Sequence, residues 1–194
     1  MSFANFLDYH HFPVYSIMVL FLGAFLIVLF GKNKFMRNLL AFLAVSISLA
    51  CIVALVKPVM LDGEIIAYWM GNRAVTGAYA IGIALEVDAL SLFFALLIST
   101  AVFVSGIYSL QYMEHDNNVP EYYTLFLMLS GGVIGLVLSG DIFNMFIMVE
   151  ILTFAAVALT AFRNKVYGAL EAAFKYLVVG CIGSTCILVG IIML

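Results

Sequence analysis

Glu150 is the residue in this chain whose position is most indicative of chemistry. It lies within the apolar stretch Asp141–Phe162, where it is the only ionisable side chain after the first residue. A charged carboxylate at the depth of a lipid bilayer costs about 3 kcal/mol or more, so such residues face a protein interior or a water-filled path. The position of Glu150 therefore indicates a site that handles protons or small cations.

Lys175 is the candidate cation for this site, because it lies inside the next apolar segment. It also has a second possible partner in Glu171, which precedes it by four residues. An acid four residues before a base is the favourable order for an ion pair on one helix. Both pairings, Lys175 with Glu150 and Lys175 with Glu171, are compatible with the sequence.

Asp141 and Thr153 are the possible accessory residues of the same segment. Asp141 opens the predicted helix, where a carboxylate is favoured by the helix dipole and can cap free N–H groups. Glu150 follows nine residues later, about 13 Å along the helix axis. On the helical face of Glu150, Thr153 is the only side chain able to hydrogen-bond, so the charge needs water or a partner from another helix.

The composition defines an integral membrane protein. The 194 residues are 66% hydrophobic and 10% charged, whereas soluble domains carry about 25% charged residues. There is no basic cluster suited to nucleic acid, the three cysteines lack metal-ligand spacing, and the three histidines lie outside the predicted spans. We therefore predict no cofactor, no metal site and no redox centre in this chain, so that any enzymatic role would belong to a larger complex.

The apolar segments predict an all-α membrane domain over residues 1–194, because a helix needs about 20 apolar residues to cross the bilayer. Six segments qualify, approximately 12–30, 37–56, 89–110, 122–139, 141–162 and 168–193. The connection Lys57–Asp88 contains turn signals between β-prone pieces and predicts a short extracytoplasmic β-hairpin.

Basic residues predict the orientation, because cytoplasmic loops are enriched in lysine and arginine. With six spans, five basic residues fall on one face and two on the other; the five are Lys32, Lys34, Arg37, Arg163 and Lys165, and the two are Lys57 and Arg73. We therefore expect both termini to be extracytoplasmic in a multi-pass protein of the cell membrane. Small residues at four-residue spacing, Gly131 with Gly135 and Gly180 with Ser184, predict close helix packing, chiefly within the chain.

Four motifs, in order along the chain, resemble the antiporter-like subunits of respiratory complex I, membrane-bound energy-converting hydrogenases and Mrp-type Na⁺/H⁺ antiporters. The run from Ser139 to Glu150 is similar to that family's acid-bearing fifth helix. The other three motifs are Gly82–Ser91, which resembles the lead into the third helix, Tyr108–Met113, which resembles its exit, and Ala169–Tyr176, which resembles the start of the sixth.

The resemblance implies a role in translocating H⁺, Na⁺ or both within a multisubunit complex. In the family, the glutamate matched by Glu150 pairs with a lysine on a broken seventh helix, whereas Lys175 matches a sixth-helix lysine. The sequence ends at Leu194, after the sixth helix, so we expect other membrane subunits, one of which supplies the missing helices. The alternatives are a truncated structural linker between modules of such a complex and a stand-alone small transporter.

Overall fold

The structure is a computed structural model that describes residues 9–70, 82–113, 118–163, 166 and 168–194. It contains the six predicted long apolar helices, each long and apolar enough to cross a membrane. They are α1 (Phe12–Phe30), α2 (Lys34–Ala54), α3 (Ala89–Tyr112), α4 (Val119–Val137), α5 (Ile142–Thr160) and α6 (Ala169–Met193). Two short helical turns accompany them, η2 (Tyr9–His11) before α1 and η3 (Lys57–Leu61) after α2.

The observed helix boundaries differ from the predicted ones where local capping decides them. Helix α2 begins at Lys34 rather than at residue 37, because the Asn33 side chain caps it by accepting a hydrogen bond from the Phe35 N–H at 3.1 Å. Helix α4 begins at Val119 rather than at residue 122, since Pro120 fits the first turn of a helix, where no N–H donor is needed.

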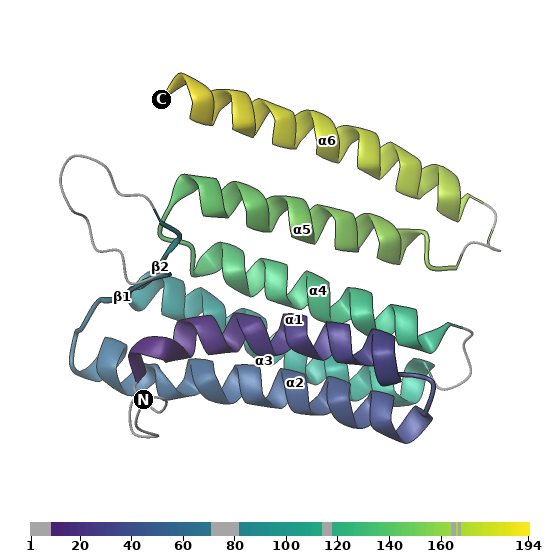
Figure 1. The fold of residues 1–194 in the computed structure, drawn as a ribbon, viewed down its shortest axis with the longest axis horizontal. Coiled ribbons are helices and arrows are strands. Elements are labelled where there is room, and N and C mark those ends of the chain that lie inside the picture. Colours follow the sequence, from purple (N-terminus) through teal and green to yellow (C-terminus); the bar gives the residue numbers. More distant parts are fainter. Residues whose placement is uncertain (1–8, 71–81, 114–117, 164–165, 167) are drawn as a thin grey trace.

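The helices are arranged so that α1 to α4 form the packed body and α5 and α6 lie to one side of it (Figure 1). Helix α5 packs between α4 and α6, and α6 packs chiefly on α5. Fully buried side chains such as Leu20, Ile52, Leu92 and Leu127 fill the core of α1 to α4. Helix α6, in contrast, buries only Ala173 and Ser184 within the described part of the chain. One face of the α5–α6 pair is therefore little covered by this chain.

Glycines allow close approach of the helices, as the small-residue spacing predicts. A Cβ atom at Gly131 would lie 3.0 Å from the Phe21 ring of α1, and one at Gly135 would lie 2.6 Å from the Met148 sulfur of α5. A Cβ at Gly180 would lie 2.7 Å from Thr153 Cγ2. The predicted intrachain packing is confirmed for these three glycines, and Ser184 is buried in the same helix as Gly180.

A two-stranded antiparallel ribbon lies at one end of the helices, formed by β1 (Ile66–Trp69) and β2 (Ala84–Val87). Ile66 pairs with Val87 and Trp69 with Ala84, in the connection where a hairpin was predicted. The link between the strands, 71–81, lies outside the described residues. Leu85 also forms a bridge with Ser139, so the ribbon is joined to the connection between α4 and α5.

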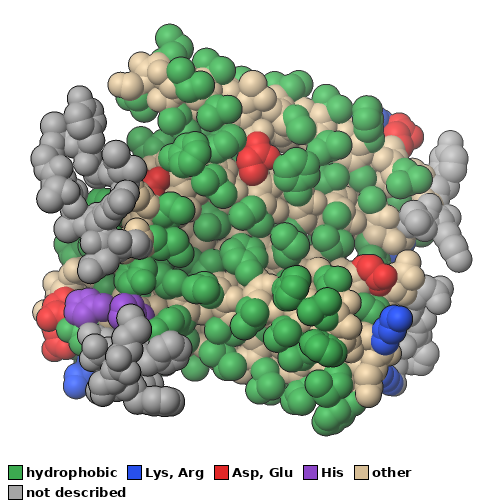
Figure 2. Space-filling model, viewed as in Figure 1, with side chains coloured by type: hydrophobic (Ala, Val, Ile, Leu, Met, Phe, Trp, Pro, Cys, Tyr) green, Lys and Arg blue, Asp and Glu red, His purple; other side chains and the backbone are tan. Residues whose placement is uncertain are grey.

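The ends of the molecule agree with an even number of crossings. Helix α1 begins, and α6 ends, at the end that carries the ribbon (Figure 1). On the face shown in Figure 2, charged side chains lie mainly near the two ends, and hydrophobic side chains cover most of the surface between them. Lys165 and Arg73, two of the residues used to predict orientation, lie outside the described residues. Which end faces the cytoplasm stays a prediction from the positive-inside rule.

Candidate functional site

Glu150 lies near the middle of α5 and is half-buried. Its neighbours on the same helical face are apolar apart from Thr153. Among the described residues, Glu150 forms no hydrogen bond and no ion pair. The structure thus places a carboxyl group at mid-helix depth without a protein partner in the described part of the chain, at the residue that the sequence singled out.

Thr153 lies one turn after Glu150 at the contact between α5 and α6. The methyl group of Thr153 can approach α6 closely because Gly180 has no side chain at the point of contact. At 100° per residue, Thr153 lies about 180° around the helix from Asn144, and Glu150 lies about 60° from Thr153. Because Asn144 is buried, Thr153 faces away from the packed body, and Glu150 lies at the flank of the α5–α6 contact.

Lys175 forms an ion pair with Glu171 rather than with Glu150. Its Nζ atom lies 2.6 Å from Glu171 Oε1, and both side chains are strongly exposed, at 72% and 65%. The contact of Thr153 with Gly180 sets the relative depth of the two antiparallel helices. Glu150 lies three residues from Thr153, and Lys175 lies five residues from Gly180 in the opposite direction. At 1.5 Å per residue, the two side chains are therefore separated by about 12 Å along the helix axes. Direct pairing of Lys175 with Glu150 is therefore absent, and the local pairing with Glu171 accounts for the lysine.

Asp141 caps α5, as predicted, and also makes a bond that the sequence did not reveal. Its Oδ1 accepts a hydrogen bond from the Asn144 N–H at 2.6 Å. Its Oδ2 accepts one from the Ala84 N–H of strand β2 at 3.0 Å. The side chain of Asn144, only 1% exposed, donates to Ser139 Oγ at 2.8 Å, so the first turn of α5 is tied to the connection before it. These polar residues could be suspected from the Ser139-Gly140-Asp141 connection, but their partner strand is remote in sequence.

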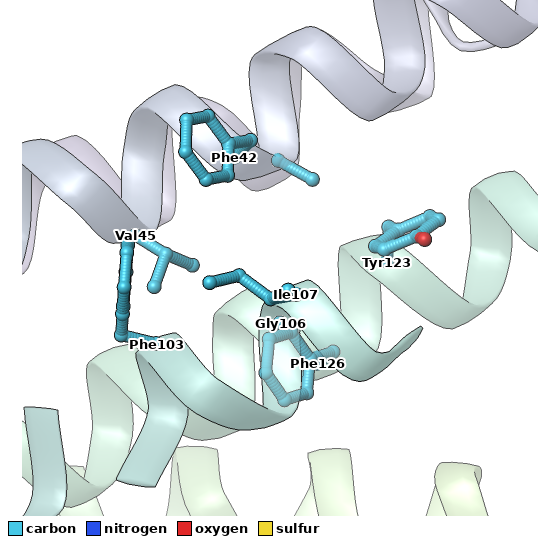
Figure 3. Close-up of a pocket in the computed structure, with 8 residues that line it drawn as sticks. Phe42, Val45, Phe103, Gly106, Ile107, Tyr123 and Phe126 are labelled. Carbon is cyan, nitrogen blue, oxygen red and sulfur yellow. The ribbon is translucent and has the colours of Figure 1, made fainter. Parts of the chain in front are cut away.

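Two apolar cavities lie elsewhere in the molecule. The smaller, of about 10 Å³, lies between α2, α3 and α4, where the side chains of Phe42, Phe103 and Phe126 surround it (Figure 3). The larger, of about 180 Å³, lies between α1, the ribbon and α5, and its lining is apolar except for Asn144. Glu150 lines neither cavity, and neither offers the polar lining that an ion path requires.

In the described part of the chain, the cysteine and histidine side chains form no group suited to a metal. Cys51 is half-buried, Cys181 and Cys186 are exposed, and all three are free thiols. Within the described ranges, no three side chains of the His, Cys, Asp and Glu types come together as a metal site would require. The described acidic and basic side chains include the helix cap Asp141, the exposed pair of Glu171 and Lys175, and the half-buried Glu150.

Two family descriptions match this chain. Residues 74–123 match the N-terminus of NADH-ubiquinone oxidoreductase (complex I) chain 5, and residues 139–194 match the transmembrane region of NADH:quinone oxidoreductase and Mrp antiporters. The second match covers α5 and α6 and therefore includes Glu150, Glu171 and Lys175.

Individual relatives agree with the family descriptions. The chain is 33% identical to NADH-quinone oxidoreductase subunit N of Rubrobacter xylanophilus, over 56% of this chain and 22% of the relative. It is 28% identical to F420H2 dehydrogenase subunit N of Methanosarcina mazei, over 80% of this chain and 30% of the relative. A solved chain of the membrane-bound sulfane sulfur reductase, an archaeal respiratory membrane complex, matches with a TM-score of 0.82 and 30% identity, over 92% of this chain and 36% of that one.

The chain thus belongs to the antiporter-like membrane subunits that Mrp antiporters share with complex I and related respiratory complexes, and it corresponds to the six-helix N-terminal portion of that family. It is a multi-pass membrane protein. It spans less than a third of the length of the two curated relatives described above.

Proposed function

We propose that this chain is an ion-translocating membrane subunit of a multisubunit complex in the cell membrane, with Glu150 as its protonatable site. The observation that carries the proposal is a half-buried carboxyl group in the middle of α5 that has no partner among the described residues. The ion is H⁺, Na⁺ or both. Family membership supports ion transport, since the matched region is shared with Mrp antiporters.

A carboxyl group at this depth can act as a carrier because its proton affinity responds to nearby charge. An approaching cation favours the ionised form, and loss of that cation favours the neutral form. Lys175 lies too far along α6 for direct contact, so its influence on Glu150 would act through water or through a movement of α6. In this proposal Glu171 binds Lys175 in the arrangement described above. Thr153 lies at the contact between α5 and α6, which a movement of α6 would change.

The partners of this chain would be other membrane subunits, including one that supplies further helices of the antiporter-like fold. The exposed surface of α6 supports this proposal. Small residues in membrane helices commonly allow a second helix to pack closely. Cβ atoms at Gly183 and Gly190 would meet nothing within 4 Å, so these two glycines are available for packing against a helix of another subunit. A partner helix on this face would also cover the flank of Glu150 and could provide the charge that the described chain does not.

A non-conducting structural linker is the second candidate. One form of that hypothesis invokes a static buried pair of Glu150 with Lys175, and the 2.6 Å pair of Lys175 with Glu171 counts against it. A linker without that pair remains an alternative, because so much of the surface of α5 and α6 is free to contact neighbouring subunits.

Ion uptake by vesicles that hold the intact complex tests the proposal. Glu150→Gln keeps the size of the side chain and removes its ability to ionise, so we expect uptake per assembled complex to be lost. Glu121→Gln, in the first turn of α4, is the matched control and should transport normally. Normal uptake by an assembled Glu150→Gln complex would overturn the proposal and favour the linker. Uptake by the purified chain alone in liposomes would favour a stand-alone transporter.

A further inference from the structure

Three segments meet at the start of α5: strand β2, the connection between α4 and α5, and the first turn of α5 itself. The Glu86 N–H donates to the Leu138 carbonyl and the Gly140 N–H donates to the Ala84 carbonyl, both at 2.9 Å. The Ala84 N–H then donates to Asp141 Oδ2 at 3.0 Å. The ribbon is thus attached to the beginning of α5 by main-chain bonds and by one carboxylate.

Gly140 explains how the ribbon comes so close. A Cβ atom at this position would lie 3.1 Å from Glu86 Cβ and 3.3 Å from the Glu86 nitrogen. The backbone of strand β2 therefore occupies the space that a side chain would need. This close approach fixes the connection against the ribbon immediately before Asp141.

This attachment restrains the start of α5, a helix of which few described residues are fully buried. Asn144 and Ala155 are its only buried residues in the described structure, and they lie on one face, three turns apart. Close contacts with α4 at Gly135 and with α6 at Gly180 also hold α5, and the bonds at Asp141 add a restraint at its first turn. A helix is stiff over nine residues, so a rotation at Asp141 would also move Glu150 relative to α6.

We propose that Asp141 is a positioning residue that joins the ribbon to α5 and so sets the placement of Glu150. This inference rests on the proposed function of Glu150. One carboxylate oxygen caps the helix and the other binds the ribbon, so the two tasks can be separated by substitution. Neither task requires Asp141 to touch the transported ion.

Asp141→Asn is the informative variant. Asparagine caps helices about as well as aspartate, but one of its two terminal groups is an NH2 donor, so it cannot offer a separate oxygen to each of the two N–H donors as aspartate does. Asp88 offers a matched control because it caps α3 in the same way, accepting a hydrogen bond from the Ser91 N–H at 2.7 Å. Ala84→Pro removes the donor on the ribbon and leaves the charge of Asp141 unchanged, so it separates loss of the bond from loss of charge.

The experiment compares the intact complex carrying Asp141→Asn, Ala84→Pro or Asp88→Asn. Ion uptake is measured in vesicles and normalised to assembled protein. Reaction of Glu150 with a hydrophobic carbodiimide is followed across pH by mass spectrometry of its peptide. A hydrophobic carbodiimide reacts with a protonated carboxyl group in apolar surroundings by taking up its proton, after which the carboxylate oxygen adds to the carbodiimide carbon. This second measurement therefore reports on the placement of Glu150 and does not require transport.

We expect Asp141→Asn and Ala84→Pro each to lower ion uptake about tenfold, which is the effect expected from losing one hydrogen bond to a charged group. Each should also shift the pH profile of Glu150 modification. Asp88→Asn should change neither quantity. If the modification profile of Asp141→Asn and Ala84→Pro equals that of the wild type, the positioning role is overturned. If the profile shifts while Glu150→Gln transports normally, Asp141 positions α5 as inferred and the proposed function of Glu150 is wrong.

Discussion

Among the glycines within α6, Gly180 is the one at which an added Cβ atom would meet a neighbour, Thr153 of α5. A Cβ atom at Gly180 would lie 2.7 Å from Thr153 Cγ2, whereas carbon atoms in ordinary contact are about 3.5–4.0 Å apart. Gly180→Ala therefore requires the two helices to separate by about 1 Å locally or Thr153 to change rotamer. Because threonine is stiff at its first side-chain torsion, we expect much of the adjustment to come from α6.

The expected loss can be separated from the general effect of alanine. Overpacking of this size costs about 1–3 kcal/mol, while alanine is favoured over glycine in a helix by about 1 kcal/mol. Gly183→Ala makes the same chemical change three residues away on the same helix, where a Cβ would meet nothing within 4 Å. The difference between the two variants therefore isolates the contact with Thr153, and we expect Gly180→Ala to be less stable than Gly183→Ala by about 1–3 kcal/mol.

Reversible unfolding of the purified protein in mixed detergent micelles measures this difference. Thr153→Ser removes Cγ2, so the double variant Gly180→Ala with Thr153→Ser should recover most of the loss, giving a favourable coupling energy in a double-mutant cycle. Equal stability of Gly180→Ala and Gly183→Ala would refute the close contact. So would a double variant in which the two effects simply add.

Two further predictions concern charged residues near the ends of helices. Glu171→Gln should change the free energy of unfolding by no more than about 0.5 kcal/mol, because the ion pair with Lys175 is exposed. Unfolding in detergent with and without added salt measures this change. A larger loss would show that the pair is shielded. Asp88→Ala removes the cap of α3 and should cost about 1 kcal/mol at neutral pH. The Ser91 N–H lowers the pKa of Asp88, so the stabilisation is complete above the pKa of the unfolded chain and is lost as pH falls through the lower folded pKa. The difference between wild type and Asp88→Ala should therefore shrink in acid, and a difference that stays constant with pH would contradict the electrostatic part of the cap.

The sequence was sufficient for those features that depend on local physics. Runs of apolar residues long enough to cross a bilayer predicted all six helices, and the four-residue spacing of Glu171 and Lys175 made the observed ion pair one of the two pairings that the sequence offered. The cap by Asp141 also followed from residue type and position. In each case the interacting groups are neighbours along the chain, so their geometry is fixed by the helix itself.

Features that depend on remote segments could not be obtained in this way. The second bond of Asp141 requires strand β2 to lie beside the start of α5, although Ala84 precedes Asp141 by 57 residues. The pairing of Lys175 remained open for the same reason, since the relative depth of α5 and α6 is set by the contact of Thr153 with Gly180. Spacing along one helix carries no information about how far a second helix slides past it.

The uneven burial of the helices connects this architecture to ion handling. Helices α1 to α4 share the buried core, while α5 is attached by one buried face and by Asp141, and α6 is attached chiefly to α5. A displacement of α6 would thus disturb few buried contacts, yet it would change the surroundings of Glu150 at the flank of the α5–α6 contact. Because the proton affinity of a carboxyl group in an apolar setting depends strongly on nearby charge and water, a small movement of α6 or of a partner helix would be enough to change it. If Glu150 is the ion site, as we propose, the loosely covered pair of helices α5 and α6 beside the packed body of α1 to α4 suits control of that site by a neighbouring subunit.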